Sequence, residues 1–330
     1  MDQGFLSFRE QTLHYFDRPH EAEVTQPVVS PAAWVGNEMP KLTELAYVLS
    51  VDEIAELDAA IAHARATGKA RKDMLAEDFP LPRLAPRIAE WRATLGDGIG
   101  LQVIRGVPVT RWSEDDAELF FWCLGLHLGR PGGQNAQQEL LGHVRDTDAN
   151  KADPMVRLYQ TSANIDYHCD AADVVGLLCL KKAKAGGKSR IVSSVSVFNR
   201  LLVQRPELAA RLFEPFFLDL RNETKDDVRG AIEIAPCRYA GGKLRTFFHS
   251  DYFRSATRHA QVPDFTPLER ECLDLYEEIA SDRDLYFDMD LEPGDIQLLS
   301  NHTNLHARTE YEDHEEPAER RHLLRLWLSL

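Results

Sequence analysis

The sequence predicts a mainly β protein with flanking helices, and three observations support this fold class. Apolar runs of strand length recur along the chain between glycine, proline and polar residues. Other stretches place apolar residues at helical spacing. The candidate metal ligands fall on different predicted strands. A double-stranded β-helix, or jelly roll, brings such strands together around one open mouth, so it is the core that we expect.

Composition bounds the class of protein. The chain has 330 residues, of which 44% are apolar and 28% charged, which is ordinary for a globular protein with a large core. We expect one domain over residues 1–330, since barrels of this length often form one. The net charge of −15 argues against a surface that follows a phosphate backbone, so we expect no nucleic-acid partner. No apolar run reaches ~18 residues, and we expect no membrane span.

Cysteine usage and the first residues point to one compartment. The cysteines are odd in number, scattered and without a CxxC pair, which fits a reducing environment rather than a disulfide framework. The N-terminus lacks the basic region followed by an apolar one that marks a secretory signal. We therefore expect a cytoplasmic protein. Cys169 lies between two candidate ligands, and strand alternation turns it away from them.

The first part of the chain combines an irregular arm with helices. Residues 1–45 contain several prolines and little periodicity, so we expect an arm packed on the domain surface and anchored by Trp34. The apolar run at 98–106 predicts a core strand. Apolar spacing and capping residues predict helices at 51–66, at 84–95 and from Ser113 through Leu128.

The second part supplies most of the predicted strands. Strand-length runs lie at 156–159, 164–168, 174–180 and 190–194. Helical patterns lie at 195–213, broken near Pro206, and at 267–281. Residues 219–262 form the least regular long stretch, and we expect a lid or a substrate-specificity insertion there, because specificity is usually built on long loops.

The chemistry centres on His168 and Asp170. Residues at i and i+2 of a strand point to the same face, so this imidazole and this carboxylate can converge on one point. A second histidine, His306, follows the turn signal at 292–295 far along the chain. Two histidines and one carboxylate, with open positions opposite, are the ligand set of non-heme Fe(II) oxygenases. Because a His-x-Asp pair alone is common by chance, the other features of the chain decide its weight.

The last predicted strand, at 321–328, separates two kinds of side chain. Alternation puts Arg321 and Arg325 on one face and leaves an apolar opposite face that should pack against helices. A buried guanidinium without an anion costs ~3–5 kcal/mol. If the arginine face looks into the barrel, it therefore needs anionic partners, and a dicarboxylate supplies one in bidentate geometry.

The His-x-Asp pair, the turn Gly186-Gly187-Lys188-Ser189, His306 and the two C-terminal arginines occur in an order and spacing that resemble one known family. This family is the TauD/TfdA-like Fe(II)/2-oxoglutarate-dependent dioxygenases. The resemblance covers residues 100–330 and is most specific over 292–328. It implies a cupin-like jelly roll and three cofactors, namely Fe(II), 2-oxoglutarate as cosubstrate, and O2.

The resemblance also implies roles for individual residues. The implied metal ligands, which are also the catalytic set, are His168, Asp170 and His306. The implied site for the distal carboxylate of 2-oxoglutarate consists of Arg321 and Ser189. The candidates for substrate contact are Arg325, Asn164 and Arg254. A structural ion pair is an equal alternative for Arg325, and a hydrogen bond at the strand end is an equal alternative for Asn164.

The implied reaction is hydroxylation, or another oxidation, of an unactivated C–H bond of a small molecule, with release of succinate and CO2. Two alternatives stay open. One is a jelly-roll protein that uses its metal and 2-oxoglutarate sites as a sensor. The other is a zinc hydrolase with the same ligand set, which would have no need of a fixed anchor for a dicarboxylate. The sequence also leaves open whether the chain forms a homo-oligomer.

Overall fold

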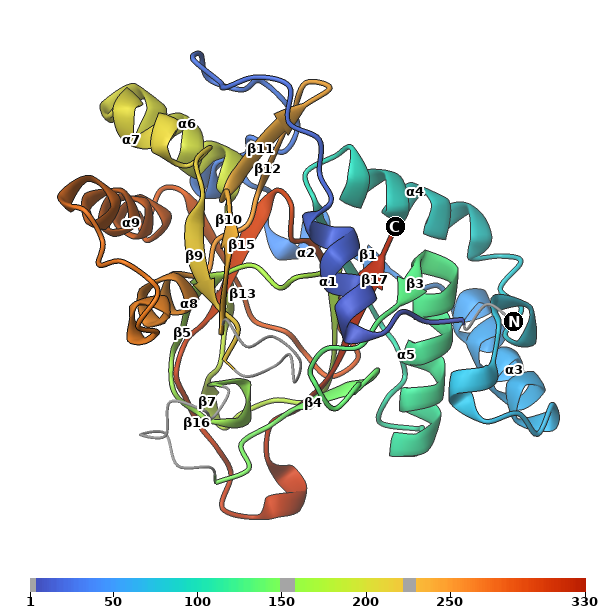
Figure 1. Cartoon of the computed structure of the whole chain (residues 1–330). Helices are drawn as coiled ribbons and strands as arrows, with labels where there is room; N and C mark the ends of the chain where they lie inside the picture. The colour runs from blue at the N-terminus through green and yellow to red at the C-terminus, as the bar shows by residue number, and fades with distance from the viewer. Residues whose placement is uncertain (1–3, 149–157, 222–229) are drawn as a thin grey trace.

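The computed structural model describes residues 4–148, 158–221 and 230–330, and two β-sheets form its centre (Figure 1). The larger sheet has the strand order β1-β2-β14-β6-β17-β3, with β4 paired to β17. The bounds of these strands are β1 (Tyr47–Val48), β2 (Leu101–Arg105), β14 (Ile296–Ser300), β6 (Val174–Lys181), β17 (His322–Ser329), β3 (Arg130–Pro131) and β4 (Gly142–Val144). The smaller sheet has the order β13-β8-β15-β5. Its strands are β13 (Tyr286–Met289), β8 (Ser189–Ser193), β15 (Asn304–Arg308) and β5 (Ile165–His168).

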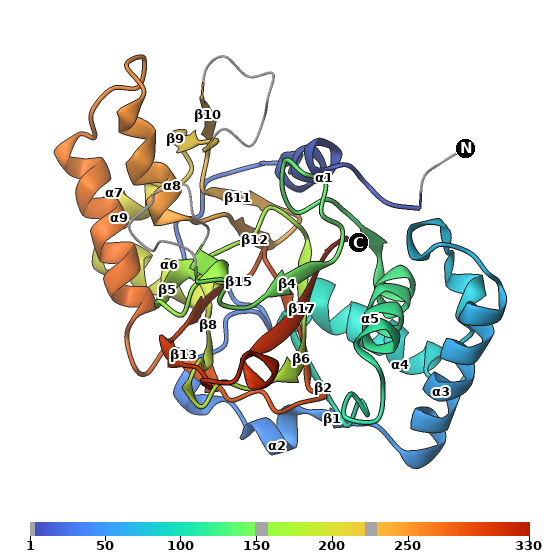
Figure 2. The ribbon, with the colours of Figure 1, turned by 90° about the horizontal axis from the view of Figure 1, so that it is seen from below.

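Two groups of helices cover the outer faces of these sheets (Figure 1 and Figure 2). The larger sheet is covered by α3 (Val51–Ala66), α4 (Ala85–Gly96) and α5 (Glu114–Leu128). The smaller sheet is covered by α6 (Ser194–Gln204), α7 (Pro206–Arg211) and α9 (Pro267–Ala280). Side-chain hydroxyls of Ser50, Ser113 and Thr266 cap α3, α5 and α9. These helices lie where the sequence predicts them, and Pro206 begins α7 after the predicted break.

Shorter elements lie outside the two large sheets. Three antiparallel two-stranded sheets pair β9 (Phe216–Asp219) with β10 (Ala231–Ile234), β11 (Cys237–Ala240) with β12 (Lys243–Thr246), and β7 (Ala185–Gly186) with β16 (Tyr311–Glu312). The remaining α-helices of the described residues are α1 (Phe8–Phe16), α2 (Leu42–Leu45) and α8 (Ser250–Ser255).

Apolar side chains pack in three layers. Between the sheets, Val103 and Trp327 of the larger sheet lie in one cluster with Ile191 of the smaller one. Outside the larger sheet, Leu324 and Leu328 of β17 pack with the apolar sides of α3, α4 and α5. A third cluster joins the smaller sheet to α6, α7 and α9. The arrangement is the predicted jelly roll with helices outside, and its two sheets share no hydrogen-bonded strand pair within the part of the chain that the structure describes.

Strand β17 has the alternation that the sequence predicts. Leu324, Leu326 and Leu328 face the helices of the larger sheet. Arg325 and Trp327 are buried on the other face, 8% and 4% exposed, toward the space between the sheets. The arginine face of β17 therefore looks inward. A cation buried in this way needs an anionic partner.

The N-terminal segment contains a helix that the sequence analysis missed. The Ser7 hydroxyl accepts a hydrogen bond from the Glu10 amide, and the Glu10 carboxylate accepts one from the Ser7 amide, so a complete capping box begins α1. The Ser-x-x-Glu signal is visible in the sequence, and the prolines that favour an irregular arm all follow the helix. Trp34 is buried, and its indole N–H lies 3.0 Å from the Ile99 carbonyl oxygen and 3.1 Å from Oδ1 of Asn304.

Two other expectations differ from the structure. Leu158–Gln160 forms a 3-10 turn where a strand at 156–159 is predicted, because the Leu158 carbonyl accepts a hydrogen bond from the Thr161 amide. Residues 156 and 157 lie outside the described residues. The described parts of 219–262 are more regular than expected, since they contain β10, β11, β12 and α8, whereas residues 222–229 lie outside the description. A lid or substrate-specificity insertion in this segment stays a prediction.

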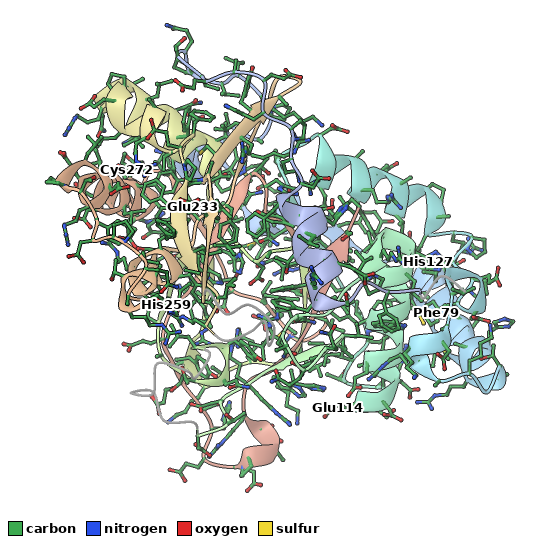
Figure 3. The ribbon with its side chains drawn as sticks, viewed as in Figure 1. Phe79, Glu114, His127, Glu233, His259 and Cys272 are labelled. Carbon is green, nitrogen blue, oxygen red and sulfur yellow. The ribbon has the colours of Figure 1, made fainter. Side chains whose placement is uncertain are left out.

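All five cysteines are unpaired and buried, as expected for a chain without a disulfide framework. Cys272 of α9 lies among the helices that cover the smaller sheet (Figure 3). Cys169 lies in the same apolar cluster, and its thiol approaches the carbonyl oxygens of Thr246 and Asn304. Its side chain is therefore turned away from the candidate ligands, as predicted. Among the described residues, none of the helices has the length and apolar character needed to cross a bilayer.

Candidate active site

The structure brings His168, Asp170 and His306 together beside the smaller sheet. His168 is the last residue of β5, and its register partner on β15 is His306. Asp170 follows two residues after His168, where the strand has ended. One ligand atom from each of the three side chains lies within 4.8 Å of the other two. The centroids of the two imidazole rings are 4.2 Å apart.

Neighbouring groups orient two of these three side chains. Nδ1 of His168 lies 2.8 Å from the Asp166 carbonyl oxygen, so the proton belongs on Nδ1 and the lone pair on Nε2. The indole N–H of Trp327 donates to Oδ2 of Asp170 at 3.1 Å. Nε2 of His306 lies 3.7 Å from the same Oδ2. Outer partners of this kind set the tautomer and the basicity of metal ligands.

The protonation state of His306 suits a ligand. Burial, together with the nearby His168 and the charge of Arg325, lowers the pKa of His306 to about 3. The ring is therefore neutral at physiological pH, which is the state in which an imidazole donates a lone pair to a metal. Two neutral imidazoles and one carboxylate on one side of a cavity match the donor set of a mononuclear iron site.

A buried arginine precedes β17. Arg321 is 6% exposed, and its Nη1 has no hydrogen-bond partner in the described structure. Its guanidinium carbon lies 5.1 Å from the centroid of the Tyr311 ring. Gly187 approaches so closely that a Cβ atom there would lie 3.1 Å from Nε of Arg321. Burial lowers the pKa of Arg321, and an anion bound beside it would shift that pKa in the opposite direction.

Further buried donors lie on the strands near Arg321. Ser189 is the register partner of Arg308, and its hydroxyl lies 2.5 Å from Oε1 of Gln297. Nε2 of Gln297, and Nε and Nη1 of Arg308, lack hydrogen-bond partners among the described residues. Nη2 of Arg308 donates to the Thr161 carbonyl at 2.7 Å. Burial and the charge of Arg321 lower the pKa of Arg308 to about 10. This region therefore offers donors and positive charge that fit a carboxylate.

Arg325 is the inward-facing arginine of β17 itself. Its Nε donates to Oε1 of Gln134 at 2.7 Å, whereas its Nη2 has no partner in the described part of the chain. The guanidinium carbon lies 4.4 Å from the Tyr159 ring centroid and 5.5 Å from that of Trp327. Aromatic rings therefore hold the flat guanidinium while one of its edges keeps an unused donor.

A small cavity, of about 90 Å³, opens beside the clustered ligands. The residues around it include His168, Asp170, Arg221, His249, Tyr252 and Arg325. The rings of His249 and Tyr252 are stacked at 3.9 Å, and the Arg221 guanidinium lies 4.2 Å from the centroid of Tyr252. A larger cavity of about 510 Å³ lies around Lys243 and Arg245 and contains none of the candidate ligands. The candidate ligands His168 and Asp170 therefore lie at the smaller cavity.

Comparison with protein-family models assigns most of the chain to a known enzyme family. The family model described as "Taurine catabolism dioxygenase TauD, TfdA family" matches residues 65–327. The chain belongs to this family. It is a 2-oxoglutarate-dependent non-heme iron dioxygenase, and its cofactors are Fe(II), 2-oxoglutarate and O2.

Relatives of this TauD/TfdA-family enzyme cover nearly its whole length. FR-33289 synthase of Streptomyces rubellomurinus is 31% identical over 311 residues, which cover 92% of this chain and 91% of the relative. Taurine hydroxylase-like protein SAT17 of Stachybotrys chartarum is 27% identical over 94% of this chain and 82% of its own. The solved structure of the non-heme iron oxygenase OrfP with Fe and alpha-ketoglutaric acid has a TM-score of 0.66 at 16% identity, over 86% of this chain and 93% of OrfP. An asparagine oxygenase has a TM-score of 0.65 at 16% identity and the same coverage. These two structures share the fold.

Two of the predicted substrate residues lie outside the small cavity of this TauD/TfdA-family enzyme. Nδ2 of Asn164 donates to the Asp166 carboxylate at 2.7 Å, just before β5. Arg254 of α8 donates to Asp274 at 2.6 Å and to Glu277 at 2.8 Å, both on α9. The structure thus does not bring Asn164 or Arg254 to the candidate ligands, because carboxylates nearer to them hold their side chains.

Several residues of this region were missed in the sequence analysis. Arg308 lies two residues after His306 on the same face of β15, so strand alternation is a signal that could have found it. Gln297 is a polar residue inside an apolar strand, which is a second usable signal. Arg221 and His249 carried no comparable signal, since only the fold brings their segments to the cavity.

Proposed function

We propose that His168, Asp170 and His306 hold the Fe(II) ion of this dioxygenase. The observation that carries the proposal is the convergence of the three ligand atoms within 4.8 Å of one another. His168 and His306 lie on two paired strands, and Asp170 follows the strand of His168. The hydrogen bonds of His168 to a backbone carbonyl and of Asp170 to Trp327 support it, because they hold ligand side chains in place.

Arg321 and Ser189 bind the distal carboxylate of 2-oxoglutarate in this proposal. The unpartnered Nη1 of buried Arg321 supports it, since a planar guanidinium pairs with a carboxylate in bidentate geometry. The unpartnered donors of Arg308 and Gln297 lie near the same strands and add to the anion site. A zinc hydrolase uses no dicarboxylate cosubstrate, so it would leave the buried donors of Arg321, Arg308 and Gln297 without an anion.

With Fe(II) and 2-oxoglutarate bound, O2 and the cosubstrate are consumed, succinate and CO2 are released, and one oxygen atom is inserted into a C–H bond of the substrate. His168, Asp170 and His306 would hold the ion beside the small cavity, where O2 and the substrate would meet it. Arg321 holds the far end of the cosubstrate and so fixes its orientation. The cavity walls limit the access of water to the reacting atoms.

The substrate in this proposal is a small molecule with an anionic group that binds Arg325. Arg325 is buried, keeps an unpartnered Nη2 and lines the cavity beside the ligands. Arg221 lines the same cavity from another segment, so two cations face the substrate. Residues 249–252 form part of the wall, and we therefore place part of the substrate specificity in the segment 219–262.

Succinate formation tests the metal and cosubstrate assignments before the substrate is known. Protein purified anaerobically is given Fe(II), ascorbate, 2-oxoglutarate and O2. We expect slow uncoupled turnover that His168→Ala abolishes and that His63→Ala, at an exposed histidine of α3, retains. Full turnover in His168→Ala, or a wild-type protein that neither turns over nor binds 2-oxoglutarate by calorimetry, would overturn the assignment.

A screen for stimulated succinate formation tests the substrate class. Small carboxylates, sulfonates and phosphonates are compared with neutral amide and ester analogues of the same size. We expect anionic compounds alone to stimulate turnover, and Arg325→Gln to lose this stimulation while it keeps the uncoupled rate. Equal stimulation by neutral analogues, or an unchanged response in Arg325→Gln, would contradict an anion at Arg325.

A further inference from the structure

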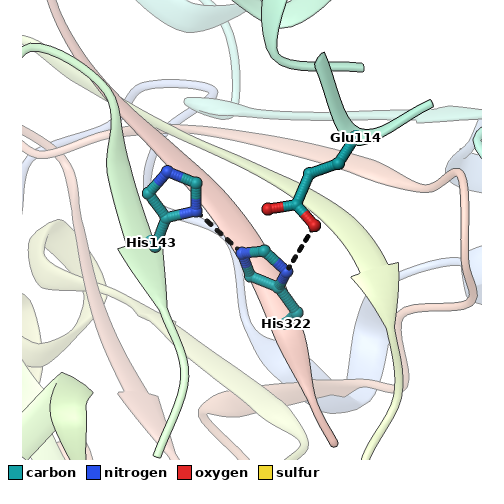
Figure 4. A group of neighbouring side chains, drawn as sticks. All are labelled: Glu114, His143 and His322. Carbon is teal, nitrogen blue, oxygen red and sulfur yellow. Dashed lines mark hydrogen bonds and ion pairs between the residues drawn. The ribbon is translucent and has the colours of Figure 1, made fainter. Parts of the chain in front are cut away.

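A second group of metal-binding donors lies on the outer side of β17 (Figure 4). We call Glu114, His143 and His322 the outer histidine cluster. Nδ1 of His143 lies 2.8 Å from Nε2 of His322, and Nδ1 of His322 lies 3.9 Å from Oε2 of Glu114. One ligand atom from each residue lies within 4.8 Å of the other two. Neither the iron site nor the 2-oxoglutarate site uses these residues.

Three different elements carry the outer histidine cluster. His322 begins β17 and shares the outward face with Leu324, opposite to the face of Arg325. His143 lies on β4, where it is the register partner of Leu324. Glu114 is the first residue of α5, at the lower end of that helix in Figure 3. Strand register and a capped helix therefore fix the backbone positions of all three donors.

The carboxylate of Glu118 also lies near His143, on the side of the ring away from His322. Glu118 lies one helical turn after Glu114, and its Oε1 is 3.8 Å from Nε2 of His143. Arg71 forms an ion pair with the other oxygen of Glu118 and holds that side chain in place. A carboxylate beside the second nitrogen of an imidazole is the arrangement that orients a metal-bound histidine.

We propose that the outer histidine cluster is a second metal site, which binds a divalent cation of the zinc type through His143, His322 and Glu114. Two imidazoles and one carboxylate with water in the last position are a known ligand set for zinc. Zn–N bonds of about 2.0–2.1 Å place two nitrogens of a tetrahedral site about 3.3 Å apart. The nitrogens of His143 and His322, now 2.8 Å apart, need to separate only slightly to admit the ion. The Glu114 side chain is 55% exposed, so it can rotate toward the ion.

Charge and protonation agree with this geometry. Burial and the neighbouring His143 lower the pKa of His322 to about 4, so the imidazole is neutral at physiological pH. The carboxylates of Glu114 and Glu118 offset the charge of the ion. Arg145 and Lys181 lie close enough to act on His322 as well, and we therefore expect a site of moderate affinity.

Metal stoichiometry tests the proposal. Full-length protein freed of metal by a chelator is titrated with Co²⁺ or Zn²⁺, and bound metal is measured by equilibrium dialysis. We expect two ions per wild-type chain, one in His143→Ala with uncoupled succinate formation retained, and one in the double variant His168→Ala/His306→Ala. The melting temperature of that double variant should rise with Zn²⁺. The control His63→Ala should bind two ions.

Two results would overturn the second site. One is a single ion per wild-type chain together with none in His168→Ala/His306→Ala, which would leave the outer histidine cluster as a hydrogen-bonded group. The other is two ions in His143→Ala. A second variant guards against misfolding: Glu114→Gln, at an exposed position, should weaken binding at this site by about tenfold or more. Its melting temperature without metal should equal that of the wild type, and unchanged affinity would remove Glu114 from the site.

Discussion

The indole N–H of Trp327 donates a hydrogen bond to Oδ2 of Asp170 over 3.1 Å. Trp327 belongs to the larger sheet, whereas Asp170 follows a strand of the smaller one. The bond therefore joins the two sheets at the proposed iron site. It holds the carboxylate at the oxygen that lies 3.7 Å from Nε2 of His306.

Trp327→Phe keeps an aromatic ring in the core but removes this donor. We expect the affinity for Fe(II) or Co²⁺ at the iron site to fall about 10–100-fold, as for other lost partners of metal ligands. Metal titration measures the change. Trp122→Phe is the matched control, because the buried indole N–H of Trp122 has no hydrogen-bond partner in the described structure. Equal effects of the two substitutions would show that ring packing, not the hydrogen bond, matters.

Arg321→Met removes the proposed anchor of 2-oxoglutarate. Hydrogen bonds to a charged group contribute about 1.5–3 kcal/mol, so half-maximal uncoupled turnover should need roughly 10–150 times more 2-oxoglutarate. A titration of succinate formation against the cosubstrate measures this shift. Arg320→Met is the control, since Arg320 pairs with Asp148 at 3.0 Å on the surface. An unchanged requirement in Arg321→Met would place the distal carboxylate elsewhere.

Gly187→Ala should disturb the same anchor through the backbone. Gly187 has φ +70°, and a Cβ atom there would lie 3.1 Å from Nε of Arg321. We expect a loss of stability of about 1–2 kcal/mol from the left-handed conformation, together with weaker 2-oxoglutarate binding. Gly241→Ala is the control, because its φ is +56° and nothing lies within 4 Å of the added Cβ. It should lose similar stability and keep its affinity for 2-oxoglutarate, as measured by unfolding and by calorimetry.

The buried imidazole of His302 predicts a dependence of stability on pH. His302 lies 2.8 Å from Asp173 and is stacked on Tyr15, and burial lowers its pKa to about 4. An unfolded histidine has a pKa near 6.5, so between pH 6.5 and pH 4 the unfolded state carries a proton on this imidazole that the folded state does not bind. The folded state should therefore lose up to about 3 kcal/mol as pH falls from 6.5 to 4.

Urea unfolding of the metal-free protein between pH 8 and pH 4 measures this dependence. His302→Gln should have a flatter profile than the wild type across this range, whatever its stability at pH 8. His63→Gln, at an exposed histidine of α3, should follow the wild-type profile. Parallel profiles for the wild type and His302→Gln would contradict the assignment of the proton to His302.

The sequence predicts those elements well whose apolar residues pack against a neighbouring element in the structure. Helices α3, α4, α5 and α9 bury one face against a sheet, so the spacing of their apolar residues carries that information. The alternation of β17 predicted which side faces the helices and which faces the interior. The sequence does not predict helix α1 although its capping box is present, and a turn forms at Leu158–Gln160 where the pattern predicts a strand. Both errors concern short segments, in which a few hydrogen bonds decide the conformation.

The sequence by itself determined which residues supply the chemical groups of the proposed site: spacing along predicted strands paired His168 with Asp170 and Arg321 with Arg325, although Asp170 and Arg321 lie just outside β5 and β17 in the structure. It also contained the family resemblance that the comparisons confirmed. Only the tertiary structure decided which distant segments meet. It paired His306 with His168, joined Arg254 of α8 to carboxylates of α9, brought Arg221 and His249 to the cavity, and assembled the outer histidine cluster. Such contacts depend on strand register and helix packing across many residues, which local periodicity does not encode.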